Sequence, residues 1–150
     1  MTYISTKTYG HEIGLSCAFR QWRADSHCKY LHGYSLAFTF RFMTEELDHR
    51  NWVVDFGGLS DLKGYLQGYF DHKTVVAEDD PHMKWFERGQ DLGVLDLIVV
   101  DSVGCEKFAE IAYNLANEWL EDNHLSSRVT LLSVEAKEHG ANTAIYSNEF

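Results

Sequence analysis

The chain has 150 residues, of which 45% are hydrophobic and 14% aromatic. This composition favours one folded domain over residues 1–150, and it argues against disorder or a second domain. The formal net charge is −10, which argues against a nucleic acid or an anionic membrane surface as partner, because clustered Lys and Arg bind both. No stretch approaches the roughly 18 consecutive apolar residues of a membrane helix, and the first residues show no signal-peptide core.

The three cysteines, Cys17, Cys28 and Cys105, are odd in number and widely spaced. They form no Cys-x-x-Cys pair, so they predict neither a disulfide framework nor a thiolate zinc knuckle. The simplest interpretation is a cytoplasmic protein that keeps its thiols reduced.

Hydrophobic periodicity predicts two strands in the first third of the chain. Alternate positions from Ile13 to Phe19 are apolar, which indicates one strand over residues 9–19 with a buried face. Residues 34–42 alternate more clearly. The polar, irregular segment 20–33 between them is expected to be a long loop, and such loops often carry functional residues.

The remaining elements are predicted from apolar residues at helical spacing or in alternation. In chain order they are a short strand at 52–56, an amphipathic helix at 59–70, an acidic segment at 73–93 with a short helix from Pro81, an apolar run at 95–100, a long helix at 105–122, and strands at 129–138 and 143–147. This order predicts an α+β fold with an antiparallel sheet and two helices on one face. The other face then needs partner subunits, so we expect a homo-oligomer.

The densest cluster of reactive side chains runs from His27 to Tyr34. Cys28 lies there beside a histidine and a lysine, which suits a nucleophile or base; the alternative is an inert small residue in a polar loop. His27 and His32 are five residues apart and have only Cys28 as a nearby soft ligand. Spacing alone therefore favours the absence of a tight metal site.

Three further acidic positions are candidates for chemistry. Asp71 and His72 would form a general acid/base pair if the chain leaves its helix there; otherwise they are a solvated helix end. Glu138 ends a predicted strand, where a carboxylate can accept two hydrogen bonds from an amidine-like ligand edge or simply belong to a charged hairpin. Glu106 opens the long helix, where the helix dipole favours an acid without any catalytic role.

Together these clusters resemble the 6-pyruvoyl- and 6-carboxytetrahydropterin synthase family in type and order, over nearly the whole chain. The matching segments are Ser16-Cys17-Ala18-Phe19-Arg20, Cys28-Lys29-Tyr30-Leu31-His32-Gly33-Tyr34-Ser35, Val54-Asp55-Phe56, Phe70-Asp71-His72, Glu106, and Lys137-Glu138 before Tyr146. The resemblance implies the tunnelling fold, a four-stranded antiparallel sheet with two helices on one face. In this fold the sheets of several subunits join into a barrel, commonly as trimers stacked into hexamers, with active sites between subunits.

The resemblance also implies roles for individual residues. Cys28 matches the catalytic thiol that moves protons at the substrate side chain. His72 matches its general acid/base partner, oriented by Asp71. Glu138 matches the carboxylate that binds the aminopyrimidinone edge of the pterin, and Glu106 lies where a second substrate-contacting acid is expected.

Zinc is the cofactor that the resemblance implies, and here the sequence departs from the family. The family binds zinc with three histidines, and the matching positions read Phe19, His32 and Tyr34. Only His32 is an ordinary zinc ligand, because phenylalanine cannot coordinate and tyrosine binds zinc poorly at neutral pH. A rebuilt site would have to draw on His27, His11 or His139.

We therefore interpret the chain as a divergent 6-carboxytetrahydropterin synthase-like lyase that acts on a dihydropterin triphosphate of the 7,8-dihydroneopterin triphosphate type. In the family reaction the side chain is cleaved and triphosphate leaves, on a route toward deazapurines and queuosine. Alternatives are a related metal-independent pterin enzyme and a non-catalytic pterin- or purine-binding oligomer. Retention of Cys28 with Asp71 and His72 favours an enzyme, whereas loss of the zinc ligands favours a binder.

Overall fold

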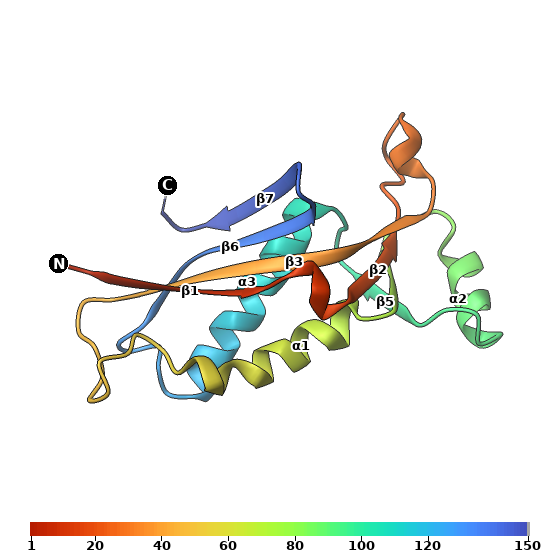
Figure 1. Ribbon diagram of the computed structural model, residues 1–150. Helices are drawn as coiled ribbons and strands as arrows, with labels where there is room; N and C mark the ends of the chain where they lie inside the picture. Colours follow the sequence, from red (N-terminus) through yellow and green to blue (C-terminus); the bar gives the residue numbers. More distant parts are fainter. Residues whose placement is uncertain (150) are drawn as a thin grey trace.

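Seven strands form one mixed sheet, and the two longest helices pack on one of its faces (Figure 1). The computed structural model describes residues 1–149. The elements are β1 (Tyr3–Tyr9), β2 (Leu15–Phe19), β3 (His32–Thr44), α1 (Ser60–Phe70), β4 (Lys73–Ala77), α2 (Met83–Asp91), β5 (Leu97–Val100), α3 (Cys105–Asp122), β6 (Thr130–His139) and β7 (Asn142–Ser147). The predicted α+β class is confirmed.

The sheet is larger than the four antiparallel strands that were predicted. Its order is β5-β4-β2-β3-β6-β7, and β1 also pairs with β3. The long β3 is central: β1 and β2 pair with it in succession, and β6 pairs with it as well, all antiparallel. The difference comes from β1, which precedes the first predicted strand, and from β4 and β5, which extend the sheet beyond β2 in parallel orientation.

The core lies between this sheet and helices α1 and α3. The alternation predicted for β3 is confirmed, since Phe38, Phe40 and Phe42 are all fully buried. From the helix side, Phe108 and Trp119 of α3 belong to the same buried cluster. This layer of buried aromatic side chains supports the candidate site.

The predicted strand over residues 9–19 is correct only for residues 15–19, which form β2. Tyr9 is the last residue of β1, a strand that was not predicted, and a 3-10 turn at His11–Ile13 separates β1 from β2. The turn ends at Gly14, whose φ of 81° lies in the left-handed region that glycine adopts without strain. The buried face of β2 is as predicted, with Leu15, Cys17 and Phe19 inside.

The predicted strand over residues 52–56 is also wrong. These residues lie in a loop in which the Asp48 carboxylate accepts hydrogen bonds from the backbone N–H groups of Arg50 and Trp52. Asp55 then accepts from the N–H of Gly57 at the start of a 3-10 turn. Side-chain capping of this kind competes with strand pairing, and hydrophobic alternation does not reveal it.

The segment that follows α1 is more ordered than the sequence suggested. Residues 73–77 form β4, which was missed because a short run such as Thr-Val-Val inside an acidic stretch gives little periodicity. The short helix expected from Pro81 exists as α2 and begins at Met83, and the apolar run at 95–100 contains β5. Among residues 1–149, no helix is long and apolar enough to cross a membrane.

Candidate functional site

The chemically important residues of β2 and β3 lie on the helix-covered face of the sheet, where β2 ends and β3 begins. In the β2–β3 register Phe19 is opposite His32, and Cys17 is opposite Tyr34. Side chains two residues apart on a strand share a face, so His32 and Tyr34 lie on the same side as the buried Leu36. The strand pairing therefore brings together the three positions at which zinc ligands were expected.

An aromatic cluster fills these positions. Phe19 is 1% exposed and packs edge-on against Phe108 of α3, with 4.9 Å between ring centroids. Its ring centroid is 5.3 Å from that of His32 and 6.1 Å from that of Tyr34. The Tyr34 ring lies 5.8 Å from the ring of His139 at the end of β6. Phe19 is thus a core residue, and Tyr34 lines the outer side of the cluster.

Cys28 lies in the loop that joins β2 to β3, the two strands that carry this cluster. It is half-buried in a 3-10 turn, and its backbone N–H donates to the hydroxyl of Ser26. Burial raises the pKa of the Tyr34 hydroxyl, and the nearby negative charges of Glu138 and of the Cys28 thiolate raise it further. Cys28 and Glu138 therefore both lie near Tyr34, which keeps its proton at neutral pH.

Glu138 lies near the N-terminus of α3, at a register shift of β6 between Lys137 and His139. It follows the fully buried Val134 and Ala136 at alternate positions of β6, and it is half-buried. Burial raises the pKa of the Cys105 thiol, as do the charges of Glu138 and Glu106. The predicted substrate-binding acids are therefore both close to the first turn of α3.

Asp71 and His72 form the pair that the sequence suggested. The chain leaves the helix at Asp71 and turns at His72, whose φ is 59°. This turn lets the Nδ1 atom of His72 approach the Asp71 carboxylate at 2.5 Å, although adjacent residues within a helix do not face each other. The His72 side chain is 86% exposed.

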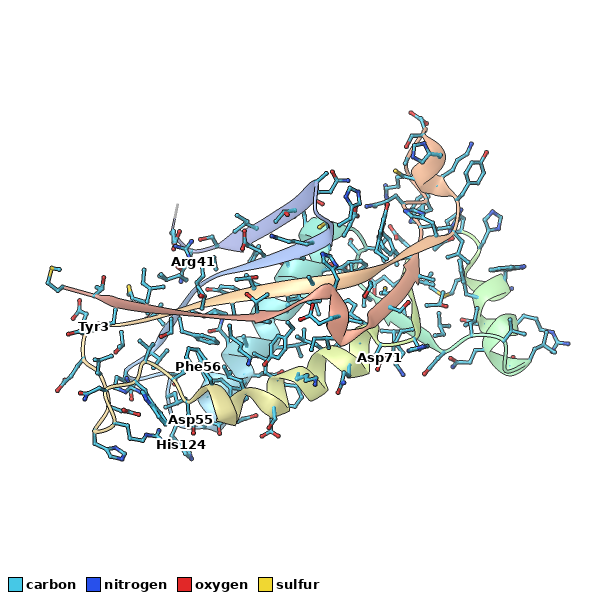
Figure 2. The ribbon with its side chains drawn as sticks, in the orientation of Figure 1. Tyr3, Arg41, Asp55, Phe56, Asp71 and His124 are labelled. Atoms are coloured by element: carbon cyan, nitrogen blue, oxygen red, sulfur yellow. The ribbon has the colours of Figure 1, made fainter. Side chains whose placement is uncertain are left out.

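The Asp71–His72 pair is separate from the cluster around Cys28. The backbone N–H of His72 donates to the carbonyl of Ser16 at the start of β2, whereas the loop that carries Cys28 (residues 20–31, called the Cys28 loop) follows the end of β2. Figure 2 shows Asp71 at the C-terminal end of α1, and Figure 1 shows the Cys28 loop (orange) projecting beyond the far end of β2. Within one chain the Asp71–His72 pair and the loop that carries Cys28 are therefore apart from each other.

The residues present do not fit the zinc site that the family resemblance implies. Of the three converging positions only His32 offers a ligand, and within residues 1–149 no group of three or more His, Cys, Asp or Glu side chains is arranged to hold a metal. The possible substitutes, His11, His27 and His139, belong to no such group within these residues. His11 donates from Nδ1 to the Ser35 carbonyl, and His139 accepts at Nδ1 from the N–H of Ala141. His27 is exposed in the loop.

Sequence reasoning missed the contacts that hold the Cys28 loop. Arg20, at the end of β2, forms an ion pair with Asp80, 60 residues later, and the Asp80 side chain is 2% exposed. Consecutive acids before a proline were visible at Asp79 and Asp80, but their basic partners were not identifiable from the sequence.

Comparisons with known proteins show the family of the chain. A family model described as 6-pyruvoyl tetrahydropterin synthase matches residues 10–149. The 6-carboxy-5,6,7,8-tetrahydropterin synthase of Rickettsia bellii is 35% identical over 54 residues, which are 35% of this chain and only 39% of that relative.

Solved structures share the fold at low identity. An uncharacterized protein from Wolinella succinogenes has a TM-score of 0.82 at 21% identity, covering 99% of both chains. The 6-pyruvoyl tetrahydropterin synthase of Plasmodium falciparum has a TM-score of 0.71 at 14% identity, covering 97% of this chain and 96% of the other. That of Caenorhabditis elegans has a TM-score of 0.61 at 14% identity, covering 99% and 96%. Because the family model spans most of its residues, the chain belongs to the 6-pyruvoyl tetrahydropterin synthase family.

Proposed function

We propose that this family member is a lyase that acts on the side chain of a dihydropterin triphosphate, in the manner of a 6-carboxytetrahydropterin synthase. The observation that carries the proposal is the place of Tyr34: its ring lies 5.8 Å from that of His139, the neighbour of Glu138, and the charges of Glu138 and Cys28 both add to the effect of burial in raising its pKa. A ring-binding acid and a proton-transferring thiol around one half-buried position suit a substrate with a flat ring and a reactive side chain.

In this proposal each charged group has a separate task. The Glu138 carboxylate accepts hydrogen bonds from the amino group and ring N–H of the aminopyrimidinone, a bidentate arrangement that fixes the ring. Glu106 adds a second acceptor at the α3 N-terminus. The Cys28 thiolate takes a proton from the substrate side chain, and His72, oriented by Asp71, acts as general acid/base. No step is assigned to a metal, because the ligand set does not fit zinc.

We also propose that the working protein is a homo-oligomer, a trimer or hexamer whose sheets join into a barrel, in the cytoplasm. The exposed Asp71–His72 pair and the distant Cys28 loop support a shared site, in which one subunit supplies the thiol and its neighbour the imidazole. The described cysteines Cys17, Cys28 and Cys105 are all free thiols, as a reducing compartment requires.

Subunit mixing tests the shared site. We expect the Cys28→Ala and His72→Ala variants to be inactive alone and to regain about one quarter of wild-type activity when their subunits are exchanged in equal amounts, because a quarter of the interfaces then combine an intact thiol with an intact imidazole. Activity that stays absent after verified subunit exchange would place both groups in one subunit.

Glu138→Gln should weaken binding of an unreactive pterin such as neopterin by about 10- to 100-fold, because one oxygen acceptor of a charge-assisted pair becomes an NH₂ donor. Isothermal titration calorimetry measures the change. Glu135→Gln is the matched control, since Glu135 lies between the buried Val134 and Ala136 and therefore faces away from the helix-covered side of the sheet. Equal affinity of the Glu138 variant and the wild type would remove Glu138 from the site.

A pterin- or purine-binding oligomer without catalysis is the second candidate function. The replacement of two zinc-ligand positions by Phe19 and Tyr34 favours it, because a binder needs no group to polarise the substrate side chain. The Cys28→Ala variant distinguishes the two candidate functions, because an enzyme loses turnover with this thiol whereas a binding protein keeps its affinity.

A further inference from the structure

We propose that Asp80 is a positioning residue for Cys28: its ion pair with Arg20 fixes the Cys28 loop (residues 20–31) against the segment between α1 and α3. The role of this ion pair in catalysis rests on the proposed function. Its effect on the exposure of the Cys28 thiol can be measured without any substrate.

The central contact is a buried bidentate pair. Arg20 donates from Nε and Nη2 to the two carboxylate oxygens of Asp80, at 2.8 and 2.7 Å. The exposed fractions of these side chains are 18% and 2%. Burial alone would raise the pKa of Asp80, but hydrogen bonds from Arg20 and from the N–H of His82 hold that pKa below its usual value. Asp80 is therefore charged and fully satisfied at neutral pH.

The same guanidinium reaches the residue next to Cys28. Arg20 donates from Nη1 to the carbonyl of Lys29 at 3.3 Å. The backbone N–H of Gln21 donates to the carbonyl of Cys28 itself at 2.9 Å. These two bonds close the base of the loop, so the direction of the Arg20 side chain determines where the Cys28 backbone lies.

Further contacts from the same segment hold the outer part of the loop. Asp79 accepts hydrogen bonds from Trp22 at 3.2 Å and from Arg23 at 2.6 Å. At the far end of the segment, the side chain of Gln21 lies close to Gly104, where an added Cβ would be 2.6 Å from its amide nitrogen. With a φ of 124°, Gly104 permits this close approach where other residues would be strained.

Of these contacts, the Arg20–Asp80 pair has the largest expected effect. The Arg23 and Asp79 side chains are 73% and 48% exposed, and exposed ion pairs contribute little to stability. Removing the charge of Asp80 instead leaves Arg20 with an unpaired charge in a largely buried place. Arg20 would then turn toward water and release Lys29.

The test compares Asp80→Asn with Asp96→Asn. Asp96 belongs to the same segment, forms a more exposed ion pair with Lys73 at 2.5 Å, and makes no described contact with the Cys28 loop. Alkylation of each cysteine by iodoacetamide is followed by mass spectrometry. We expect Cys28 to react about three- to tenfold faster in Asp80→Asn, because local opening exposes a half-buried thiol. The buried Cys17 and Cys105 should stay protected, and Asp96→Asn should behave as wild type.

Two results would overturn the proposal: an unchanged Cys28 rate in Asp80→Asn, or equal acceleration of all three cysteines, which would indicate general destabilisation. If Asp80→Asn does not fold, Arg20→Lys replaces it, because this change keeps the charge but loses the bidentate geometry. We then expect an intermediate acceleration of alkylation at Cys28 alone. An unchanged alkylation rate at Cys28 would count against the proposal.

Turnover gives a second readout. If the chain cleaves a dihydropterin triphosphate, Asp80→Asn should lower kcat by about tenfold or more with a smaller change in KM, since sub-ångström displacement of a catalytic group is costly while ring binding at Glu138 is unaffected. A wild type without turnover would defeat the proposed function and leave the alkylation result standing.

Discussion

The Cys28→Ala variant is expected to lose turnover of a dihydropterin triphosphate by about 10²- to 10⁴-fold, the usual loss when a positioned proton-transfer group is removed. Its affinity for an unreactive pterin should stay within about twofold of wild type, because the ring is bound by Glu138 and Glu106 rather than by the thiol. Single-turnover kinetics measure the first quantity, and calorimetry with neopterin measures the second.

Cys17→Ala is the matched control for this experiment. Cys17 also carries a thiol and lies on β2 opposite Tyr34, but burial raises its pKa to about 12. It remains protonated at neutral pH and cannot act as a base, so its loss should cost some stability and leave kcat nearly unchanged. The comparison separates the chemistry of one thiol from the packing of another.

The outcome also decides between the two candidate functions. An enzyme shows wild-type turnover, its loss in Cys28→Ala, and retained binding. If the wild type binds neopterin but turns over no dihydropterin triphosphate, and Cys28→Ala binds equally well, the chain is a binding protein. Full activity of the Cys28→Ala variant would show that another group removes the proton.

Strong local periodicity explains which parts of the fold were predictable. Helix α3 begins and ends where the apolar stripe predicted, at Cys105 and Asp122, and the alternating phenylalanines located β3. The parallel strands β4 and β5 were not predictable in the same way, since strands of four or five residues carry little pattern. The pairing of β4 to β2, and of β5 to β4, depends on tertiary contacts that no local signal contains.

The candidate site was predictable as a set of residues but not as an arrangement. Strand alternation alone implied that Phe19 lies on the buried face of its strand, whereas the register shift of β6 between Lys137 and His139, where Glu138 lies, has no local signal. The contact between Asp71 and His72 depends on a positive φ at a histidine, which is uncommon outside glycine. The Arg20–Asp80 pair joins residues 60 positions apart, so its discovery required the fold.

The geometry around Phe19 also makes a strong prediction about zinc. The centroids of the Phe19, His32 and Tyr34 rings are 5.3 to 6.1 Å from one another. Imidazole rings that ligate one zinc ion at about 2 Å have centroids about 5 Å apart. His32 already donates its Nδ1 hydrogen to the Tyr30 carbonyl at 2.6 Å, which leaves Nε2 free and the ring oriented, as in zinc sites with a supporting carbonyl.

The double variant Phe19→His, Tyr34→His is therefore expected to bind zinc, whereas the wild type, purified without a histidine tag and with zinc available, is expected to contain far less than one zinc per chain. In chelator the variant should be less stable than wild type by about 1–3 kcal/mol, because an imidazole replaces a 1% exposed phenylalanine beside Phe108. Zinc at about 1,000 times its Kd should raise the free energy of unfolding of the double variant by about 4 kcal/mol. For a domain of this size, that corresponds to a rise of roughly 8–16 °C in Tm.

Elemental analysis and thermal unfolding with and without zinc measure these changes, and Tyr34→His alone, with two ligands, is the control that should respond weakly. A double variant that stays metal-free, with a Tm insensitive to zinc, would mean that the three positions do not converge as described. A wild type with about one zinc per chain would instead mean that His32 has recruited other ligands, and the proposed metal-free proton transfer would have to be abandoned.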